Sequence, residues 1–326
     1  MKFPPTILSG MRPTGPLHLG HLLGALKNWA GLQDSYRCFY MVADWHAFFS
    51  EYEDPGMIRE YTRQSVADWL SVGLDPEKST IFVQSAVPEH AELHLILSTL
   101  TPLPWLERCP TYKEQLREVT GRDLLTYGFL GYPVLQAADI MLYRATAVPV
   151  GNDQVPHLEL SREIVRRFNG LFRPVFPEPR PLLTESSRIL GLDNRKMSKS
   201  YGNFIALSDP PAEIEKKVRG MITDTQRIRL SDPGHPEDCN VFSYHRLFNS
   251  GQLAEVEDWC RNARLGCTDC KKCLAGALAD YLAPIREKRE SWLKGDRVGE
   301  VLEAGTARAR AAAAETMSLV REAIRF

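Results

Sequence analysis

The chain has 326 residues, of which 44% are hydrophobic and 25% are charged, and its formal net charge at pH 7 is −1. This length accommodates one large domain and a smaller one around a well-buried core, and the composition is that of a globular protein. The near-zero charge excludes RNA binding through an overall basic surface, so an RNA partner would have to contact local basic patches. The candidate patches, which as isolated clusters can equally be solvated helix faces, are Arg162, Arg166 and Arg167, and Arg286, Lys288 and Arg289.

The opening residues do not have the charged-then-apolar pattern of a signal peptide, and no apolar run approaches the ~20 residues of a membrane span. We therefore expect a cytoplasmic protein that contacts no membrane. Because the cytoplasm disfavours structural disulfides, its cysteines are expected to be free thiols or metal ligands.

Short apolar runs alternate with helical patterns in the first half of the chain. The predicted strands are residues 6–8, 38–43, 79–83 and 146–150. Helical spacing is clearest at Leu19, Leu22, Leu23 and Leu26, over residues 56–71, and around Leu158, Val165 and Phe168. This alternation predicts an α/β fold with a doubly wound, Rossmann-like parallel sheet, in which ligands bind beyond the carboxyl ends of the strands.

From about Pro210 onward the strand signals fade and helical patterns dominate. Residues 298–326 are rich in Ala, Arg and Glu, and they place Met317, Val320 and Ile324 on one helix face. The proline-rich residues 174–181 are predicted to form a connection. The expected organisation is a catalytic domain over residues 1–205, with a connective insert at about 105–130, and a C-terminal helical domain over residues 206–326.

A glycine-containing turn at residues 9–21 joins the first strand to a helix. The free N–H groups and positive dipole end at such a turn suit phosphate, although the segment is neither a Walker loop nor a dinucleotide fingerprint. His18 and His21 flank Gly20 and share one helix face, so both imidazoles can donate to one phosphate chain. Gly20 lets a nucleotide approach the backbone closely. The alternative interpretation is that the two histidines only cap the helix.

A second polar motif lies near residue 200, where Lys196-Met197-Ser198-Lys199-Ser200 is flanked by glycines. Two lysines three residues apart can place two ammonium groups on a triphosphate and stabilise the charge that builds on a leaving pyrophosphate. Taken alone, the segment can also be an ordinary exposed basic loop.

The pattern of residues 131–140 predicts a helix that is opened by Pro133. Its polar stripe consists of Tyr132, Gln136, Asp139 and Tyr143. A carboxylate on an otherwise apolar helix is costly unless it faces a partner or a ligand, and Asp139 can accept the indole N–H of tryptophan. Asp139 can alternatively be a structural acid paired with a lysine or arginine. Asp153, after the predicted strand 146–150, is placed to accept from ribose hydroxyls.

Five of the seven cysteines crowd into one segment, at Cys239, Cys260, Cys267, Cys270 and Cys273. A Cys-x-x-Cys pair with further thiols in a cytoplasmic protein is typical of a metal site. Ligand type allows both Zn²⁺ and an iron–sulfur cluster, since each accepts four thiolates. The alternative is a set of unliganded buried thiols.

The two phosphate motifs together resemble the paired signatures of class I aminoacyl-tRNA synthetases. Residues 196–200 match the family's KMSKS motif letter for letter, and residues 18–21 match its HIGH motif with Leu19 in place of isoleucine. The resemblance extends over essentially the whole chain. It implies attack of an amino-acid carboxylate on the α-phosphate of ATP, with Mg²⁺ on the pyrophosphate oxygens, and transfer of the aminoacyl group to a tRNA 3′ end.

Residues 132–140 and 148–154, with 9–15 and 42–46, look like those of tryptophanyl-tRNA synthetases. This resemblance implies L-tryptophan and tRNA(Trp) as partners and a homodimer. It assigns catalysis to His18, His21, Lys196 and Lys199, and tryptophan binding to Asp139, Tyr132, Gln136, Gln154 and His46. The implied ATP contacts are Arg12, Pro13, Thr14, Gly20, His21, Gly151, Asn152, Asp153, Ile189, Lys196, Met197, Ser198, Lys199 and Ser200.

One departure concerns Gln136, which stands where many bacterial members carry methionine. Gln followed three residues later by Asp also resembles archaeal-type tyrosyl-tRNA synthetases, so tyrosine is the alternative substrate. A non-catalytic paralogue that binds RNA or protein is a further alternative, although such a paralogue has no physical reason to keep two phosphate lysines and a buried acid. A small nucleotidyltransferase with the same histidine motif would be a shorter chain.

Some tryptophanyl-tRNA synthetases hold a [4Fe–4S] cluster in the helical domain, near the anticodon site, and the cysteine-rich segment resembles theirs. The resemblance implies a cluster bound by Cys239, Cys260, Cys267 and Cys270, with Zn²⁺ as the alternative. The gap after Cys239 is slightly shorter than in that pattern, and Cys273 is an additional thiol.

Overall fold

The computed structural model describes residues 5–109, 125–151, 154–183 and 189–326 of the chain. The chain divides into two compact units. Unit 1 comprises Met1–Thr14, Ala25–Ser186 and Leu293–Phe326, and unit 2 comprises Gly15–Gly24 and Ser187–Trp292. These compact units do not coincide with the two domains expected from the sequence, whose boundary at residue 205 stays a prediction.

A parallel sheet with strand order β3-β2-β1-β4-β5 forms the centre of unit 1. The strands are β1 (Thr6–Met11), β2 (Arg37–Val42), β3 (Ser79–Val83), β4 (Ala147–Val150) and β5 (Arg180–Leu183). All four strand pairs are parallel, which confirms the predicted doubly wound α/β fold. The order reverses between β1 and β4, so the crevice at their carboxyl ends is where such a sheet binds ligands.

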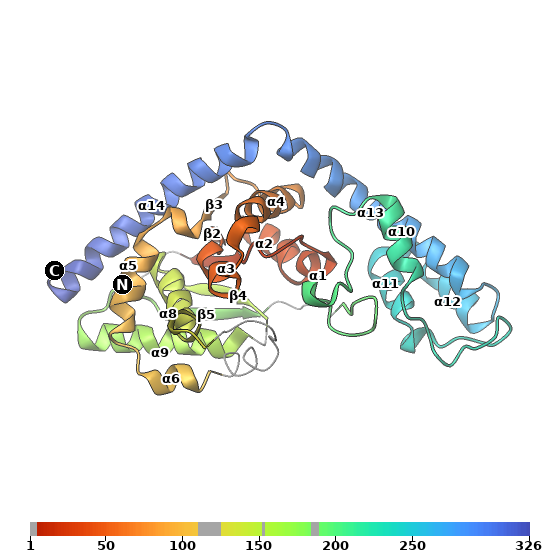
Figure 1. The fold of residues 1–326 in the computed structure, drawn as a ribbon, viewed down its shortest axis with the longest axis horizontal. Helices are drawn as coiled ribbons and strands as arrows, with labels where there is room; N and C mark the ends of the chain where they lie inside the picture. The colour runs from red at the N-terminus through yellow and green to blue at the C-terminus, as the bar shows by residue number, and fades with distance from the viewer. Residues whose placement is uncertain (1–4, 110–124, 152–153, 184–188) are drawn as a thin grey trace. The chain divides into compact units, whose positions relative to one another are not determined.

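The helices surround this sheet in unit 1 and make up most of unit 2 (Figure 1). Those of unit 1 are α2 (Lys27–Leu32), α3 (Asp44–Glu51), α4 (Ile58–Ser71), α5 (Glu89–Ser98), α6 (Leu103–Glu107), α8 (Tyr127–Leu142), α9 (Val155–Leu171) and α14 (Arg297–Ile324). Unit 2 contains α1 (Leu19–His21), α10 (Pro211–Arg219), α11 (Asn240–Phe248), α12 (Leu253–Arg261) and nearly all of α13 (Cys267–Leu293). The shorter turns used below are η3 (Gln84–Ala86) and η5 (Lys199–Tyr201). Among the described residues, no helix combines the length and apolar character needed to span a membrane.

Alternation along β2 divides the apolar residues of unit 1 between the two faces of the sheet. Phe39 and Met41 join a core that also contains residues of α5, α8, α9 and α14. On the other face, the Tyr40 ring stacks on Trp29 at a centroid distance of 4.7 Å, and Trp29 meets Trp69 edge-on at 5.3 Å. The strand is buried on both faces, as in other parallel sheets that are covered by helices.

The last helix, α14, covers the edge strand β3 and lies beside α5 (Figure 1). Gly305 lies so close to Ile81 that a Cβ at this position would overlap the Ile81 carbonyl oxygen. Arg308 Nη2 donates to the carbonyl oxygens of Pro76 at 2.8 Å and Ser79 at 3.2 Å. The sequence led us to group this helix with the helical domain, but its apolar stripe, which includes Met317, packs on the sheet. The helix thereby protects an edge that would otherwise be open to pairing.

The predicted connection at residues 174–181 is confirmed over residues 174–179, which contain no helix or strand, and its last two residues begin the edge strand β5. This strand tolerates Pro181 because an edge position can do without one N–H donor. The prediction for Pro133 was wrong. Pro133 does not open its helix: α8 begins at Tyr127, after the N-cap Thr126, and Pro133 lies inside it. The Thr126 side chain accepts the Phe129 N–H at 3.2 Å, and this cap sets the helix start instead.

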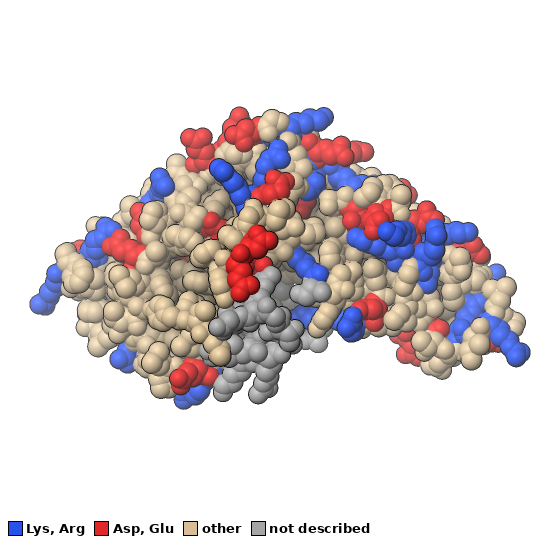
Figure 2. Space-filling view, in the orientation of Figure 1, with Lys and Arg blue, Asp and Glu red and all other residues tan. Residues whose placement is uncertain are grey.

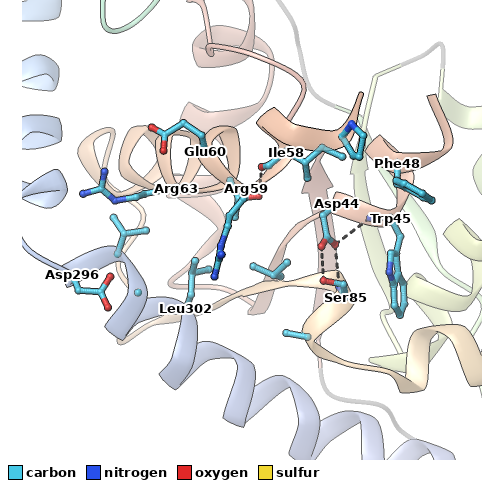
Figure 3. Close-up of a pocket in the computed structure, with 16 residues that line it drawn as sticks. Asp44, Trp45, Phe48, Ile58, Arg59, Glu60, Arg63, Ser85, Asp296 and Leu302 are labelled. Carbon is cyan, nitrogen blue, oxygen red and sulfur yellow. Dashed lines mark hydrogen bonds between the residues drawn. The ribbon is translucent and has the colours of Figure 1, made fainter. Parts of the chain in front are cut away.

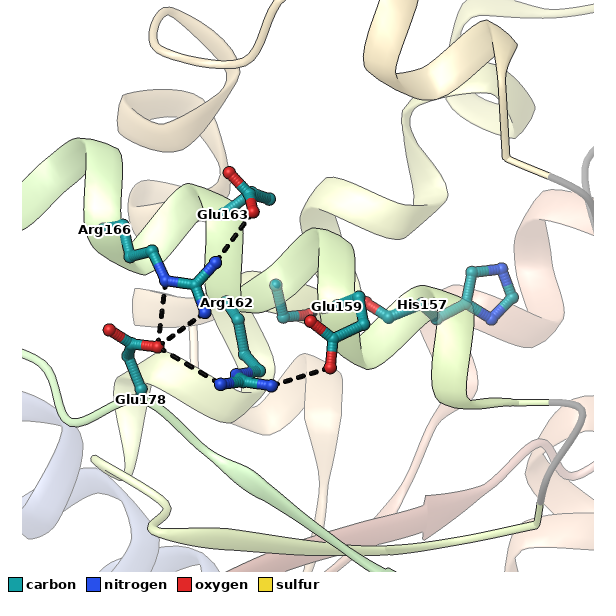
Figure 4. Close-up of polar contacts among 7 residues, drawn as sticks. His157, Glu159, Arg162, Glu163, Arg166 and Glu178 are labelled. Carbon is teal, nitrogen blue, oxygen red and sulfur yellow. Dashed lines mark hydrogen bonds and ion pairs between the residues drawn. The ribbon is translucent and has the colours of Figure 1, made fainter.

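The first candidate basic patch is largely neutralised by acidic neighbours (Figure 4). Arg162 and Arg166 on α9 pair with Glu159 and Glu163, each at 2.7 Å, and both also contact Glu178. Acidic and basic side chains are likewise interspersed over the face of the molecule in Figure 2. The two arginines are therefore poor candidates for binding a phosphate backbone.

We expect Gly305→Ala to lower the free energy of unfolding by about 1–3 kcal/mol, because the added methyl group forces α14 away from β3. This loss should appear even though alanine has the higher helix propensity. The matched control is Gly170→Ala in α9, where an added Cβ meets nothing within 4 Å. Urea unfolding, monitored by circular dichroism, measures the stability of both variants. Equal unfolding midpoints for the two variants would contradict the close approach of α14 to β3.

Candidate active site

His18 and His21 form a compact pair at the start of α1, with ring centroids 3.8 Å apart. His18 Nδ1 accepts the Gly20 N–H at 3.1 Å, and His21 Nδ1 accepts the His18 N–H at 3.2 Å. Since Nδ1 is the acceptor in each ring, the proton of each neutral imidazole is on Nε2. Within the described residues neither Nε2 has a hydrogen-bond partner. The two interpretations of this motif are therefore compatible: the rings cap the helix through Nδ1 and present two Nε2–H donors.

The electrostatic surroundings keep both rings neutral. Burial, and secondarily the charge of Lys199, lowers the pKa of His18 to about 4. Burial, and to a smaller extent electrostatic interactions with His18 and Lys199, lowers the pKa of His21 well below its usual value. Two neutral N–H donors can approach a phosphate chain without repelling the lysines that share its charge.

Residues of the KMSKS segment contact the turn that carries these histidines. Lys199 Nζ donates to the Gly15 carbonyl at 2.9 Å. The buried Met197 lies against Gly20, where an added Cβ would be 3.4 Å from the methionine sulfur. Lys196 is exposed. The segment therefore presents one lysine to solvent while the other reaches the turn.

Asn203, which we did not identify from sequence, organises the backbone of this segment. Its Oδ1 accepts the Ser198 N–H at 2.9 Å, and its Nδ2 donates to the Lys196 carbonyl at 3.1 Å and to Asp193 Oδ1 at 2.7 Å. The side chain is buried, with 5% of its surface exposed. Asn203 thus fixes the backbone of the segment.

The remaining candidate ATP contacts are spread over both units. Arg12, Pro13 and Thr14 directly follow β1, and Gly151 directly follows β4, so these residues border the crevice at the strand-order reversal. Ile189 is half-buried in unit 2. Asn152, Asp153 and the side chain of Ser200 lie outside what the structure describes.

Asp139 on α8 is the centre of a buried hydrogen-bond network in unit 1. Its Oδ2 accepts from His46 Nε2 at 2.8 Å, and its Oδ1 accepts from Gln84 Nε2 at 2.8 Å and His90 Nδ1 at 2.7 Å. Burial opposes ionisation, yet the hydrogen bonds from His46 and His90 and the electrostatic interactions with these rings outweigh it and lower the pKa of the carboxyl. Asp139 is therefore a charged carboxylate whose described partners are two histidines and a glutamine rather than a lysine or arginine.

Three separate elements bring these donors to Asp139. His46 lies in the first turn of α3 after β2, Gln84 directly follows β3, and His90 lies at the start of α5. The Asp44 carboxylate joins two of these elements, because it accepts from the N–H of Trp45 at 3.1 Å and from the N–H and hydroxyl of Ser85 (Figure 3). This bridge between the ends of β2 and β3 fixes the spacing of His46 and Gln84. It also forms part of the wall of an open pocket that Arg59, Arg63 and Leu302 line.

A second chain of hydrogen bonds involves two further tryptophan-site candidates. The Tyr132 hydroxyl lies 2.8 Å from His157 Nε2, and Gln154 Oε1 lies 3.0 Å from His157 Nδ1. Tyr132 also meets the His46 ring edge-on at a centroid distance of 6.5 Å. Gln136 is half-buried, and no hydrogen-bond partner for it occurs among the described residues.

Gln84, His90 and His157 are the polar residues of these networks that sequence reasoning missed. A signal existed for His90, which lies on the same buried face of α5 as Leu93 and Leu97. A signal existed for Gln84 as well, because it directly follows a predicted strand, where parallel sheets place their sites. We found no comparable signal for His157.

Four cysteines of unit 2 line one small pocket, together with Arg227 and Trp259; these cysteines are Cys239, Cys260, Cys267 and Cys270. Burial, followed by the charges of the other cysteines, raises the pKa of Cys270 to about 12. Cys273 is not among the lining residues, and its sulfur lies 3.7 Å from Asn249 Nδ2. Within the described chain, no three His, Cys, Asp or Glu residues are placed to hold a single metal ion.

Comparisons with known proteins agree over nearly the whole chain. The family model described as tRNA synthetases class I (W and Y) matches residues 2–283. The tryptophan–tRNA ligase of Thermotoga maritima is 52% identical over 322 residues, which cover 98% of each chain. That of Aquifex aeolicus is 43% identical over 390 residues, which cover 98% of this chain and 99% of the relative.

Solved structures give the same result. A tryptophanyl-tRNA synthetase from Campylobacter jejuni, complexed with ADP and tryptophan, has a TM-score of 0.91 at 33% identity and covers 98% of this chain and 100% of its own. A tyrosyl-tRNA synthetase from Archaeoglobus fulgidus has a TM-score of 0.65 at 21% identity, and the match covers 87% of this chain and 90% of the synthetase. The second likeness is one of fold alone.

The depressed pKa of His18 predicts a specific loss of stability in acid. Its imidazole binds a proton near pH 6.5 when unfolded but only near pH 4 when folded, so the free energy of unfolding falls as the pH drops through this interval. The part of this fall in the free energy of unfolding that is due to His18 reaches about 3 kcal/mol. His18→Asn retains an oxygen acceptor for the Gly20 N–H but does not titrate. Urea unfolding between these pH values should therefore show a shallower loss for the variant; parallel curves would contradict the shift.

Proposed function

This chain belongs to the class I aminoacyl-tRNA synthetases of the tryptophan and tyrosine group and is a tryptophan–tRNA ligase, and we propose that two groups of residues divide its reaction. The residues around Asp139 recognise L-tryptophan, and the segments that carry His18 and Lys199 handle ATP. The observation that carries this division is the charged, buried Asp139 carboxylate in one unit and the paired neutral histidines in the other. The ATP-dependent product is tryptophanyl adenylate, which then charges tRNA(Trp).

In the proposed adenylation step, an oxygen of the tryptophan carboxylate forms a bond to the α-phosphorus as the bond to the bridging oxygen of pyrophosphate breaks. Negative charge then accumulates on the leaving pyrophosphate. The Nε2–H groups of His18 and His21 donate to the phosphate chain, and the ammonium groups of Lys196 and Lys199 stabilise the developing charge. Bound Mg²⁺ would neutralise further charge on the pyrophosphate oxygens. Catalysis then consists of positioning and electrostatics, without a covalent enzyme intermediate.

The same proposal gives roles to the other crevice residues. Arg12, Pro13 and Thr14 after β1, and Gly151 after β4, bind the nucleotide together with Gly20, Asn152, Asp153, Ile189 and the KMSKS residues. Asp139 accepts the indole N–H, which neither tyrosine nor phenylalanine carries on its ring. Tyr132, Gln136, Gln154 and His46 line the remainder of the amino-acid pocket. A site built to accept from a ring donor rejects phenylalanine, whose ring has none.

We also propose that residues 206–326 include the anticodon-binding region and that the enzyme is a homodimer. Support for a dimer comes from large apolar side chains that are exposed on α5, on α6, at the first residue of α8 and just before that helix. These are Leu95 at 66%, Leu103 at 59%, Leu125 at 75% and Tyr127 at 74% exposure. Exposed apolar residues of this size around one region are typical of a surface that a second copy covers.

The cysteine pocket supports the further proposal of a [4Fe–4S] cluster. Four thiolates around one zinc ion lie about 3.8 Å apart, because each Zn–S bond is about 2.3 Å. In a cubane cluster each cysteine binds a different iron, so four cysteines can line a wider site. The shared four-cysteine pocket is the observation that supports the cluster, with Zn²⁺ as the alternative.

Neighbouring side chains also suit such a cluster. His245 Nε2 lies 3.5 Å from Cys270 Sγ, and Arg227 Nη1 lies 3.9 Å from Cys267 Sγ, so donors face two of the four sulfurs. Donors of this kind stabilise thiolate ligands. When bound, the cluster would supply a structural cross-link among α11, α12 and α13. Adenylation itself transfers no electron.

We expect Lys196→Ala and Lys199→Ala each to lower the rate of ATP–pyrophosphate exchange by roughly 10²–10³, because each removes charge that acts on the leaving group. Tryptophan affinity should hardly change, since neither lysine contacts the amino acid in this proposal. Exchange assays with tryptophan, tyrosine and phenylalanine test the role and the substrate together. A variant that altered only the tryptophan KM, or a wild type that preferred tyrosine, would contradict the assignment.

The cluster proposal predicts about four iron and four sulfide ions per chain after anaerobic purification, with a broad absorption band near ~400 nm. Cys260→Ser should abolish the band, and its matched control Cys273→Ser should retain it, because Cys273 lies outside the pocket. The Cys260 variant should also lose more activity in tRNA charging than in pyrophosphate exchange. Stoichiometric zinc without the band, or equal loss in both variants, would reject the cluster.

A further inference from the structure

The geometry around Asp139 leaves a single place for a ligand donor. An ionised carboxylate offers about four lone-pair positions, two on each oxygen. Gln84 and His90 donate to Oδ1, at 2.8 and 2.7 Å, and fill both of its positions. His46 donates to Oδ2 at 2.8 Å and fills one. Among the described residues no other group donates to this carboxylate, so one acceptor position remains, and it is on Oδ2.

The donor character of His90 depends on a residue behind it. His90 Nε2 lies 2.8 Å from the Tyr143 hydroxyl, on the side of the ring away from Asp139. A neutral His90 ring that donates from Nδ1 to the carboxylate accepts at Nε2, and the Tyr143 hydroxyl is then the donor. Burial, followed by the charge of Asp139, raises the pKa of Tyr143, which keeps this proton in place. Tyr143 thus selects the tautomer that lets His90 donate to Asp139.

Both residues are held rigidly in the core. His90 is 0% exposed and Tyr143 is 5% exposed. The Tyr143 ring stacks on Phe39 of β2 at a centroid distance of 4.4 Å, and Phe82 of β3 lies over His90 at 6.0 Å. A hydrogen-bonded pair with so little room to turn can fix the rotation of the carboxylate that it contacts.

We propose that His90, oriented by Tyr143, and Gln84 are positioning residues for tryptophan recognition. They fill both acceptor positions of Oδ1, so that the remaining position on Oδ2 receives the indole N–H. The inference rests on the proposed role of Asp139 and extends it: the choice of ring depends on residues that act through the carboxylate. Without the donors to Oδ1, a buried carboxylate can rotate or take up a proton, and its free acceptor is no longer aimed at the ligand.

The test compares tryptophan with β-(1-benzothiophen-3-yl)-L-alanine, which has sulfur in place of the indole N–H. Titration calorimetry gives the ratio of the two dissociation constants for each protein. His90→Leu should reduce the wild-type preference for tryptophan about tenfold, the size expected when a hydrogen bond to a charged group is lost. His90→Asn should restore most of it, because its amide nitrogen can donate from near the position of Nδ1. Tyr143→Phe should reduce the preference several-fold.

The matched control is Tyr40→Phe, which removes another fully buried hydroxyl, the donor to the Trp29 carbonyl at 2.8 Å. This variant should keep the wild-type ratio. Partial misfolding cannot imitate the expected result, because a smaller folded fraction affects the titrations of both ligands equally and leaves the ratio of their dissociation constants unchanged. In pyrophosphate exchange, His90→Leu should raise the tryptophan KM and leave kcat nearly unchanged.

Asp139→Ala separates this inference from the proposed role of Asp139. If Asp139→Ala loses the preference while His90→Leu and Tyr143→Phe keep it, the positioning role is wrong and the role of Asp139 stands. If Asp139→Ala itself keeps the preference, the proposed role of Asp139 is wrong. A His90→Asn ratio no better than that of His90→Leu would also overturn the inference, because the ring rather than its donor would then be what matters.

Discussion

Removing the charged carboxylate of Asp139 from water imposes the strictest requirement in this structure. A buried charge is tolerated only when hydrogen bonds replace the water that it has lost. No single element supplies these bonds: His46 comes from the end of β2, Gln84 from the end of β3 and His90 from the start of α5. Three features of the fold therefore bring donors to one carboxylate: the order of the strands, the Asp44–Ser85 bridge and the packing of α5 on α8.

The two segments that we propose to handle ATP have the opposite electrostatic character, because their histidines are uncharged. His18 and His21 are kept neutral, and each uses one ring nitrogen to complete the start of α1 while the other remains a donor. Asn203 holds the backbone of the KMSKS segment. In the proposed reaction, positive charge comes from the two lysines, while the two histidine donors carry none.

The two units also differ in how distant parts of their chain are held together. Unit 1 uses a distant part of its own chain, because α14 returns to cover the edge strand β3 and closes the core with Met317 and Val320. Unit 2 gathers four cysteine side chains around one pocket. A cross-link there would stabilise a region whose smaller apolar core contributes less. The proposed cluster in unit 2 and the long terminal helix in unit 1 would thus both stabilise their unit by joining segments that are distant in sequence.

The sequence by itself determined the features whose residues are neighbours along the chain. The HIGH-like and KMSKS segments, the first four strands and the polar stripe of α8 were all predictable, because local spacing sets which side chains share a face. Local context misled at Pro133, since a cap at Thr126 overrode the usual effect of proline. Tertiary structure alone decided that Gln84 and His90, 55 and 49 residues from Asp139, would donate to its carboxylate. The same holds for the packing of α14 on β3 and for the pocket that excludes Cys273. These contacts join elements far apart in sequence, and which elements meet is set by burial of apolar faces across the whole fold, which no local spacing records.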